Sequence, residues 1–505
     1  MSIVSPGQAE EPLILTIDIG TSVVRTALFD RLGRAVGGFE ARQMHEIRTT
    51  SQGASETDPD SLLEVVFDCL DRVLATAGHF SNKIAGVASC TFVSNILGID
   101  KSKRAVMPLT TYADTRAAAE VPGLKADFDE AAFHDRTGCR FHPSYLPARF
   151  RWLARSQPDL FHRVARWVSI GEYLELKLFG ETAVSYSVAS WTGLLNRSSL
   201  SWDKTLLSGL PVQIEQISPL TDVNIPRRGL RPEFAARWPI LRDLPWFPAV
   251  GDGATANIGS GCISPARVAL SGGTTSAVRA ILTNPPEHLP SGLWSYRVDG
   301  RRSLLGGALS EGGSVFGWMK STLHLENLSG IEELLAAMEP DGHGLTVLPF
   351  LAGERSPGWA GHARGTIHGL SLATTPLDIL RAGLEAVAYR IALVFDLLRK
   401  VLPADPQVVA SGGALLSSPA WLQIMTDVLG RPVFVSGVQE ASGRGAALLA
   451  LEALGVLPDL EAAPDFVAAV YQPNFSRHAR YQKAMIRQQK LYEKLVKSEI
   501  LNPES

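Results

Sequence analysis

Residues 13–30, LILTIDIGTSVVRTALFD, decide the fold, because an apolar strand runs into a turn of small residues and out into a second strand. The turn offers backbone N–H groups and hydroxyls with little bulk, an arginine adds a fixed positive charge, and an aspartate can hold Mg²⁺ directly or through water. This arrangement is typical of a hairpin that grips phosphate. A purely structural hairpin also favours Gly and Thr at its turn, so the motif alone leaves both interpretations equally open. The candidate phosphate and metal residues are Gly20, Thr21, Ser22, Arg25 and Asp18.

A second hairpin, residues 266–282 (ARVALSGGTTSAVRAIL), repeats this plan halfway along the chain. An apolar strand leads to a small hydroxylated turn at residues 271–276, and the returning strand carries Arg279. Two similar hairpins indicate a duplicated fold in which each half gives one loop to a phosphate chain held between them. The sequence therefore predicts an interdomain cleft, whose second phosphate loop contains Gly273, Thr274 and Thr275.

The composition narrows the class of protein. The chain has 505 residues, of which 45% are hydrophobic and 20% charged, and this predicts two globular domains of roughly 250 residues each. A formal net charge of −3 argues against a nucleic-acid partner. The N-terminus lacks a signal-peptide pattern and no apolar run approaches the roughly 18 residues that span a bilayer, so we expect a soluble protein with no membrane partner. The cysteines match neither a zinc site nor a disulfide framework, which favours the cytoplasm: Cys69, Cys90, Cys139 and Cys262.

The periodicity of apolar residues indicates α/β architecture. Residues 58–78 have the spacing of an amphipathic helix behind an Asp-Pro-Asp-Ser start, and residues 83–90 have the pattern of a buried strand. Hairpins, a crossover helix and a further strand predict mixed sheets flanked by helices. We expect one domain over residues 1–250, a second over 251–480, and a charged helical tail over 481–505 with a solvated face.

Asp252 is the candidate general base. It stands between two glycines directly after an apolar strand, in WFPAVGDGATANIGSG, residues 246–261. Phosphoryl transfer to a hydroxyl needs positioning and charge neutralisation, and an aspartate can orient the hydroxyl and take its proton late. A dinucleotide fingerprint is excluded, because the next acidic residue after Asp252 is Glu287, too distant to bind a ribose. An aspartate that bonds only its own turn backbone stays open as the alternative.

A third type of loop follows the strand at residues 407–411. Gly412, Gly413 and Ala414 lead from that strand into a helix and allow a flat adenine ring to lie against the backbone. Taken singly these are ordinary tight-packing residues, but their order behind two phosphate hairpins favours a nucleotide site.

From about residue 13 to residue 454 the chain resembles the FGGY carbohydrate kinases of the actin-like ATPase superfamily. The motifs DIGTSVVR, GDGATANIGSG, SGGTTSAVR and ASGGALLSSPAWLQIMTDVLGRPV, together with residues 365–385, carry this resemblance. It implies two duplicated ribonuclease H-like domains, the first binding sugar and the second ATP, in a cleft that closes by rotation. It also implies ATP-dependent phosphorylation of a sugar hydroxyl, with Mg²⁺ at Asp18 and Asp252 and with Gly312 in the nucleotide site.

Several segments look most like the gluconate-kinase branch of that family. They include TYADTR (111–116), TGCRFHP (137–143), GGALSEGGSVFGW (306–318) and LAGERSPGW (351–359). The resemblance places the sugar substrate against Asp114, Arg116, His142 and Asp252. An anionic sugar acid would want cations nearby, and these segments and their neighbours offer Arg116, Arg140, His142 and Arg149.

Gluconate is therefore the first expected substrate, and a ketopentose such as xylulose or ribulose is the alternative. Residues 89–100, SCTFVSNILGID, have Val93 and Ser94 where many gluconate and xylulose kinases have Met-His, which leaves the sugar open. A non-catalytic ATP-binding or filament-forming relative is the alternative from another class. A homodimer is also left open.

Overall fold

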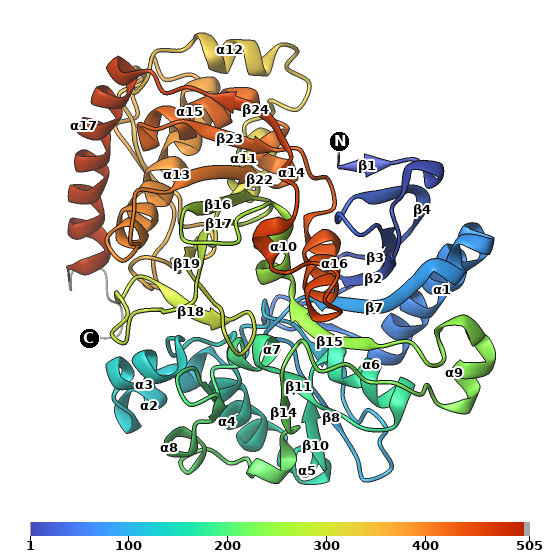
Figure 1. Ribbon diagram of the computed structural model, residues 1–505. Coiled ribbons are helices and arrows are strands. Elements are labelled where there is room, and N and C mark those ends of the chain that lie inside the picture. The colour runs from blue at the N-terminus through green and yellow to red at the C-terminus, as the bar shows by residue number, and fades with distance from the viewer. Residues whose placement is uncertain (1, 499–505) are drawn as a thin grey trace.

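The first hairpin lies in the middle of a six-stranded sheet in the computed structural model, which describes residues 2–498 (Figure 1). The strand order is β1-β4-β3-β2-β7-β15, where β3 is antiparallel to β2 and β4 while β2, β7 and β15 run parallel. All seven residues of β2 are buried, because α1 and α6 cover one face of the sheet and α16 covers the other. The strands are β1 (Ile3–Val4), β2 (Leu13–Ile19), β3 (Val23–Phe29), β4 (Ala35–Met44), β7 (Ile84–Thr91) and β15 (Trp246–Gly251).

The second hairpin occupies the same place in a seven-stranded sheet of order β18-β19-β17-β16-β22-β23-β24. Here β17 is antiparallel to β16 and β19, while β16, β22 and β23 run parallel. The shared order of five strands confirms the predicted duplication. The strands are β16 (Arg267–Gly272), β17 (Ser276–Leu282), β18 (Trp294–Arg297), β19 (Ser303–Ala308), β22 (Gln407–Ser411), β23 (Val433–Ser436) and β24 (Val467–Tyr471).

Helices and short strand pairs complete the two domains. In the first half the helices are α1 (Pro59–Ala77), α2 (Val121–Asp127), α3 (Glu130–Thr137), α4 (Leu146–Ser156), α5 (Pro158–Arg163), α6 (Ile170–Phe179), α7 (Tyr186–Ser190), α8 (Lys204–Leu207) and α9 (Pro232–Arg237). In the second half they are α10 (Asp252–Gly259), α11 (Gly313–Thr322), α12 (Ile331–Ala337), α13 (Pro376–Arg399), α14 (Gly413–Leu416), α15 (Pro419–Leu429), α16 (Ala441–Ala453) and α17 (Phe475–Tyr492). The short strands are β5 (Arg48–Thr49), β6 (Ser55–Thr57), β8 (Leu97–Ile99), β9 (Leu109–Thr110), β10 (Arg166–Val168), β11 (Val184–Ser185), β12 (Leu195–Asn196), β13 (Ser201–Trp202), β14 (Leu220–Thr221), β20 (Thr346–Leu348) and β21 (Thr366–His368).

Local sequence signals explain several helix ends. The Asp58 side chain accepts a hydrogen bond from the Ser61 N–H at the start of α1. The Ser418 hydroxyl caps α15, and Gly430 ends this helix with a φ of 64°, a conformation that favours glycine. The apolar face of α15 is buried against α13, and these two helices enclose the core of the second domain.

Two helices at the centre of the molecule, α10 and α16, join the domains (Figure 1). A Cβ on Gly445 would lie 1.9 Å from the Thr255 carbonyl oxygen, so only glycine permits this contact between the helices. The guanidinium of Arg444 is buried in α16 and donates to the carbonyl oxygens of Gly33, Gly259 and Pro464. It thereby ties the β3–β4 turn of the first domain to the end of α10.

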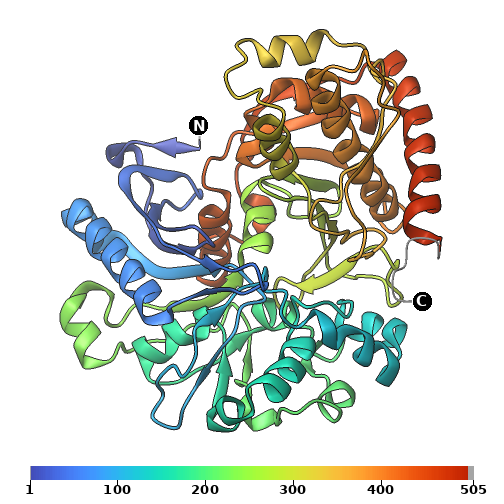
Figure 2. The same ribbon diagram turned by 180° about the vertical axis from the view of Figure 1, so that it is seen from behind.

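The C-terminal helix α17 runs along the outer edge of the second domain, as both views show (Figures 1 and 2). Its side chains Tyr481, Ala484, Gln488 and Tyr492 are buried against α15 and β20. The expectation of a solvated face for the tail was wrong for this side of the helix. The many charged residues of the segment lie on its outer side, and the four buried residues form a stripe that packs against the domain. Of the expected tail over 481–505, residues 499–505 lie outside the described residues.

We propose to divide the chain into domains 1–250 and 251–480, because β15 is the last strand of the first sheet and β16 opens the second. Within residues 2–498 no helix combines the length and apolar character that a membrane crossing requires.

Candidate active site

Asp252 is the first residue of α10 and follows β15 directly. Because β2, β7 and β15 are parallel, their carboxyl ends meet at one edge of the sheet, and Asp18 and Asp252 come close there. Burial raises the pKa of Asp252 from 3.8 to about 6, while the Gly253 N–H and Arg279 act in the opposite direction. The carboxylate does accept the Gly253 N–H at 2.7 Å, as a turn aspartate would, but its place beside Asp18 fits a catalytic role as well.

Asp18 is 5% exposed and lies opposite Arg25 in the hairpin. Burial raises the pKa of Asp18 to about 7, the positive charge of Arg25 lowers it, and the negative charge of Asp252 raises it. The Arg25 guanidinium lies 3.4 Å from the Asp18 carboxylate and 3.5 Å from that of Glu440, which precedes α16. A cavity of about 160 Å³ opens between these residues and strands β3 and β4. Sequence reasoning missed Glu440, which no local motif marks.

The residues around Asp18 and Asp252 fit a hard divalent cation. Both groups are carboxylates, the ligand type that Mg²⁺ prefers, and each is held at a strand end beside the other. Thr21 lies partly exposed next to the Tyr112 phenol, and Ser22 is exposed at the turn of the hairpin.

The second phosphate loop packs through its backbone against the start of α11, while its two threonine side chains are exposed. Gly313 donates its N–H to the Gly273 carbonyl oxygen at 2.8 Å, and Ser314 donates to the Thr274 carbonyl oxygen at 3.1 Å. A Cβ on Gly312 would collide with the backbone of Thr274 and Thr275, whose side chains are exposed.

The expected adenosine loop lies beside the second phosphate loop. Gly412 has a φ of 94°, and a Cβ there would clash with the Gly272 backbone. Ala414 packs directly against Gly313, so the structure brings residues 273–275, 312–313 and 412–414 together. Backbone N–H groups, two small hydroxyls and little side-chain bulk are what a phosphate chain and a flat base require, so the residues present fit ATP.

The cations expected to meet an anionic sugar are mostly engaged elsewhere. Arg116 donates to both oxygens of Asp114 and to Glu56, and its guanidinium lies over the Trp152 ring. Arg149 is buried and donates to the carbonyl oxygens of Ser94, Pro143 and Thr111. Arg140 binds Glu130 and the Ser291 carbonyl oxygen.

The contact of Asp114 and Arg116 with a substrate stays a prediction, and their pairing leaves no free positive charge on this arginine. The Arg116 guanidinium forms an ion pair with the Asp114 carboxylate inside the first domain, and Glu56 is its second partner. His142 does lie in the aromatic region near the cleft, but burial and the positive charge of Arg355 lower its pKa to about 3. Its imidazole is neutral and offers no charge to a substrate.

Aromatic side chains line the space next to Asp252. The Trp191 ring packs against Gly251 and Gly253, the neighbours of the aspartate, and stacks on Tyr296 with ring centroids 3.6 Å apart. Trp359 meets the His142 ring edge to face at 6.1 Å. Such surfaces exclude water and pack against the C–H faces of sugars.

Arg355 is the cation that sequence reasoning missed. Its Nε is buried with no hydrogen-bond partner, and among residues 2–498 no carboxylate lies within ion-pair distance of its guanidinium. Its positive charge acts on Tyr112, His142 and Arg279, and the charge of Asp252 acts on the first and the last of these, one from each domain. The segment LAGERSPGW was recognised as informative, but nothing local distinguishes Arg355 from a surface charge.

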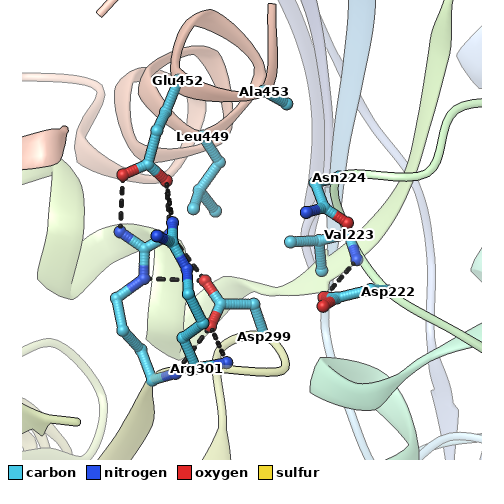
Figure 3. Close-up of a pocket in the computed structure, with 9 residues that line it drawn as sticks. Asp222, Val223, Asn224, Asp299, Arg301, Leu449, Glu452 and Ala453 are labelled. Atoms are coloured by element: carbon cyan, nitrogen blue, oxygen red, sulfur yellow. Dashed lines mark hydrogen bonds and ion pairs between the residues drawn. The ribbon is translucent and has the colours of Figure 1, made fainter. Parts of the chain in front are cut away.

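A larger cavity of about 390 Å³ lies between the β18–β19 turn, α16 and residues 222–224 (Figure 3). Its charges satisfy one another: Arg302 pairs with Asp299 and Glu452, and the Gly300 N–H donates to Asp222. We interpret it as a polar joint between the domains.

The two halves of the chain match two models of known families. Residues 13–259 match the FGGY family of carbohydrate kinases, N-terminal domain, and residues 268–454 match the C-terminal domain of the same family. The chain belongs to the FGGY family of carbohydrate kinases. The recognition from sequence motifs, the two-domain actin-like fold and the assignment as a carbohydrate kinase are thereby confirmed.

Relatives with different substrates are similarly distant. The gluconokinase of Bacillus subtilis (strain 168) is 25% identical over 470 residues, which cover 91% of each chain. The crystal structure of gluconate kinase from Lactobacillus acidophilus gives a TM-score of 0.87 at 26% identity and covers 96% of this chain and 98% of that one. Ligand-bound xylulose kinase from the same organism also gives 0.87 at 26% identity, with 96% and 99% covered.

Proposed function

We propose that this kinase transfers the terminal phosphoryl group of ATP to a hydroxyl of a sugar acid, with gluconate as the first candidate. The observation that carries the proposal is the Arg355 side chain, whose Nε is buried without a hydrogen-bond partner and whose charge acts on Tyr112 and Arg279, two residues that also sense Asp252. A buried N–H without a partner is costly, and a substrate carboxylate would satisfy the Nε of this half-buried arginine with charge-assisted hydrogen bonds. The similarity to gluconokinases supports the same choice.

The side chains divide the work as follows. Asp252 accepts the proton of the acceptor hydroxyl at a carboxylate oxygen, for which its raised pKa of about 6 suits it. Mg²⁺, held by Asp18 and Asp252, neutralises charge on the phosphates when it is bound. Trp191 and Tyr296 keep water away from the acceptor, and Arg355 orients the substrate carboxylate. The phosphates lie against Gly20, Thr21, Ser22, Arg25, Gly273, Thr274, Thr275 and Gly312, and adenosine lies against Gly412, Gly413 and Ala414.

A ketopentose kinase is the second candidate. It is favoured by the equal TM-score of the xylulose kinase structure. The acceptor region also fits a neutral sugar, because His142 is uncharged and the aromatic rings suit any sugar face.

We also propose that the protein works in the cytoplasm, with which its four free, buried cysteines agree.

Release of ADP across a panel of gluconate, xylulose, ribulose and glycerol tests the proposal. We expect turnover to be fastest with gluconate, and Asp252→Asn to lower it by about 10²–10⁴-fold while ATP affinity stays similar. Preference for a ketopentose would replace the first candidate by the second. ATP binding without acceptor-dependent turnover, or a matching collapse of ATP affinity in Asp252→Asn, would overturn the assigned roles.

A further inference from the structure

The segment that carries Arg355 and Trp359, residues 354–360, is called the acceptor loop below. It folds around the carboxylate of its own first residue: Glu354 accepts the Gly358 N–H at 3.2 Å and the Ala360 N–H at 3.4 Å. The Glu354 N–H in turn donates to the Ala360 carbonyl oxygen at 3.0 Å. Glu354 is 2% exposed, so the conformation of the loop depends on a buried charge.

The acceptor loop needs an external support. Trp359 has a φ of 56°, a left-handed conformation that is unfavourable for a non-glycine residue and persists only where the surroundings enforce it. The Glu354 carboxylate also lies near a second buried acid, Glu311, whose pKa burial raises to about 8. An isolated carboxylate in this place would be unstable, and the loop would rearrange.

The support comes from two helices of the second domain. Arg390 of α13 donates to one oxygen of Glu354, and the Tyr492 hydroxyl at the end of α17 donates to the other at 2.6 Å. The Arg390 guanidinium lies over the Tyr492 ring, 4.7 Å from its centroid. A Cβ on Gly358 would lie 2.0 Å from the Tyr492 hydroxyl, so the tyrosine touches the loop directly.

We propose that Tyr492 is a positioning residue of the kinase: through Glu354 it holds the acceptor loop in the conformation that presents Arg355 and Trp359 to the acceptor. The helix that carries Tyr492 lies beyond the part of the chain that matches the family's C-terminal domain. The proposed support for substrate binding therefore comes from a segment outside the matched residues. The inference rests on the proposed function only in that the acceptor loop binds the acceptor.

The chain offers a matched control on the same helix. Tyr481 is also buried, and its hydroxyl bonds Arg381 and Glu385 but touches nothing in the acceptor loop. Tyr492→Phe and Tyr481→Phe each remove one buried hydroxyl from α17, so a general loss of stability affects both. We expect only Tyr492→Phe to raise the KM for the acceptor, by roughly tenfold, with kcat and the KM for ATP within about twofold.

Hydrogen exchange tests the same inference without turnover. In Tyr492→Phe the amides of Gly358 and Ala360 should exchange faster than in the wild-type protein, and in Tyr481→Phe they should not. If no sugar is turned over, this measurement still decides the positioning role, so failure of the proposed function remains distinguishable. Gly358→Ala, which displaces Tyr492 from the loop side, should reproduce the kinetic signature if Tyr492→Phe does not fold. Equal effects of the two tyrosine variants on acceptor KM and on exchange would overturn the proposal.

Discussion

In the proposed function, Arg355 supplies the charge that favours a sugar acid over a neutral sugar. Replacing it by methionine keeps an unbranched apolar stem but removes the guanidinium, so a bound carboxylate would lose its partner. For Arg355→Met we expect kcat/KM for gluconate to fall on the order of a hundredfold and kcat/KM for a neutral sugar to change much less. The measurement is ADP release with both acceptors at saturating ATP.

Arg116→Met is the matched control for this prediction. Its guanidinium is committed to Asp114 and Glu56, so its loss should lower the melting temperature and leave the ratio between acceptors unchanged. A selective loss of gluconate turnover in Arg116→Met, with none in Arg355→Met, would show that Arg116, and not Arg355, binds the substrate carboxylate.

Individual functional residues could be predicted from the sequence where a local motif marks them. Asp18 lies at the end of an apolar strand and Asp252 directly after one, each with glycine nearby, and the structure brings them together. Arg355 and Arg116 could not be told apart in this way, because what distinguishes them is a partner distant in sequence. Glu56 precedes Arg116 by 60 residues, and no spacing rule connects the two.

The contact between α10 and α16 gives a prediction about elements. In Gly445→Ala the added methyl group would lie 1.9 Å from the Thr255 carbonyl oxygen, so the helices must move apart. Overpacking of this kind costs about 1–3 kcal/mol, which should lower the melting temperature by several degrees. Because Asp252 begins α10, we expect kcat to fall as well, and both quantities are measured on the same preparation.

Gly317 in α11 is the control for this substitution. A Cβ there meets nothing within 4 Å, so Gly317→Ala should be neutral or stabilising by about 0.4–1 kcal/mol. If both alanine variants melt at the wild-type temperature, the two central helices are not packed as tightly as their backbone separation indicates.

Helices could be predicted from sequence where apolar spacing and end signals agree, as in α1 and α15. For α17 the composition misled, because its buried stripe contains a polar residue. Gln488 is buried and donates to the carbonyl oxygens of Val347 and Ala386. Residues 481, 484, 488 and 492 do follow helical spacing. Hydrophobic periodicity does not detect them as a buried face, because the face includes a glutamine and its neighbours are lysines and arginines.

For the whole molecule, the duplication could be predicted because the two hairpins repeat a local pattern. The joints between the halves could not, since they consist of single side chains that reach backbone atoms far along the chain. His134 of α3 is such a joint, since its Nε2–H donates to the Leu293 carbonyl oxygen at 2.7 Å. Burial lowers the pKa of His134 from 6.5 to about 4, Arg140 and Arg197 lower it further, and Leu293 and Asp135 act in the opposite direction.

This joint should make the protein sensitive to acid. Between pH 6.5 and about 4 the unfolded chain binds a proton at His134 and the folded chain does not, so stability falls as the pH falls through this window. The difference amounts to about 3 kcal/mol. His134→Gln can still donate to Leu293 but does not titrate, so its melting temperature should fall less than that of the wild-type protein between pH 7 and pH 4. His288→Gln, at an exposed histidine whose pKa is raised by Asp135, should retain the full decline. If the melting temperatures of the wild-type protein and His134→Gln fall equally between pH 7 and pH 4, protonation of His134 does not contribute to the acid sensitivity.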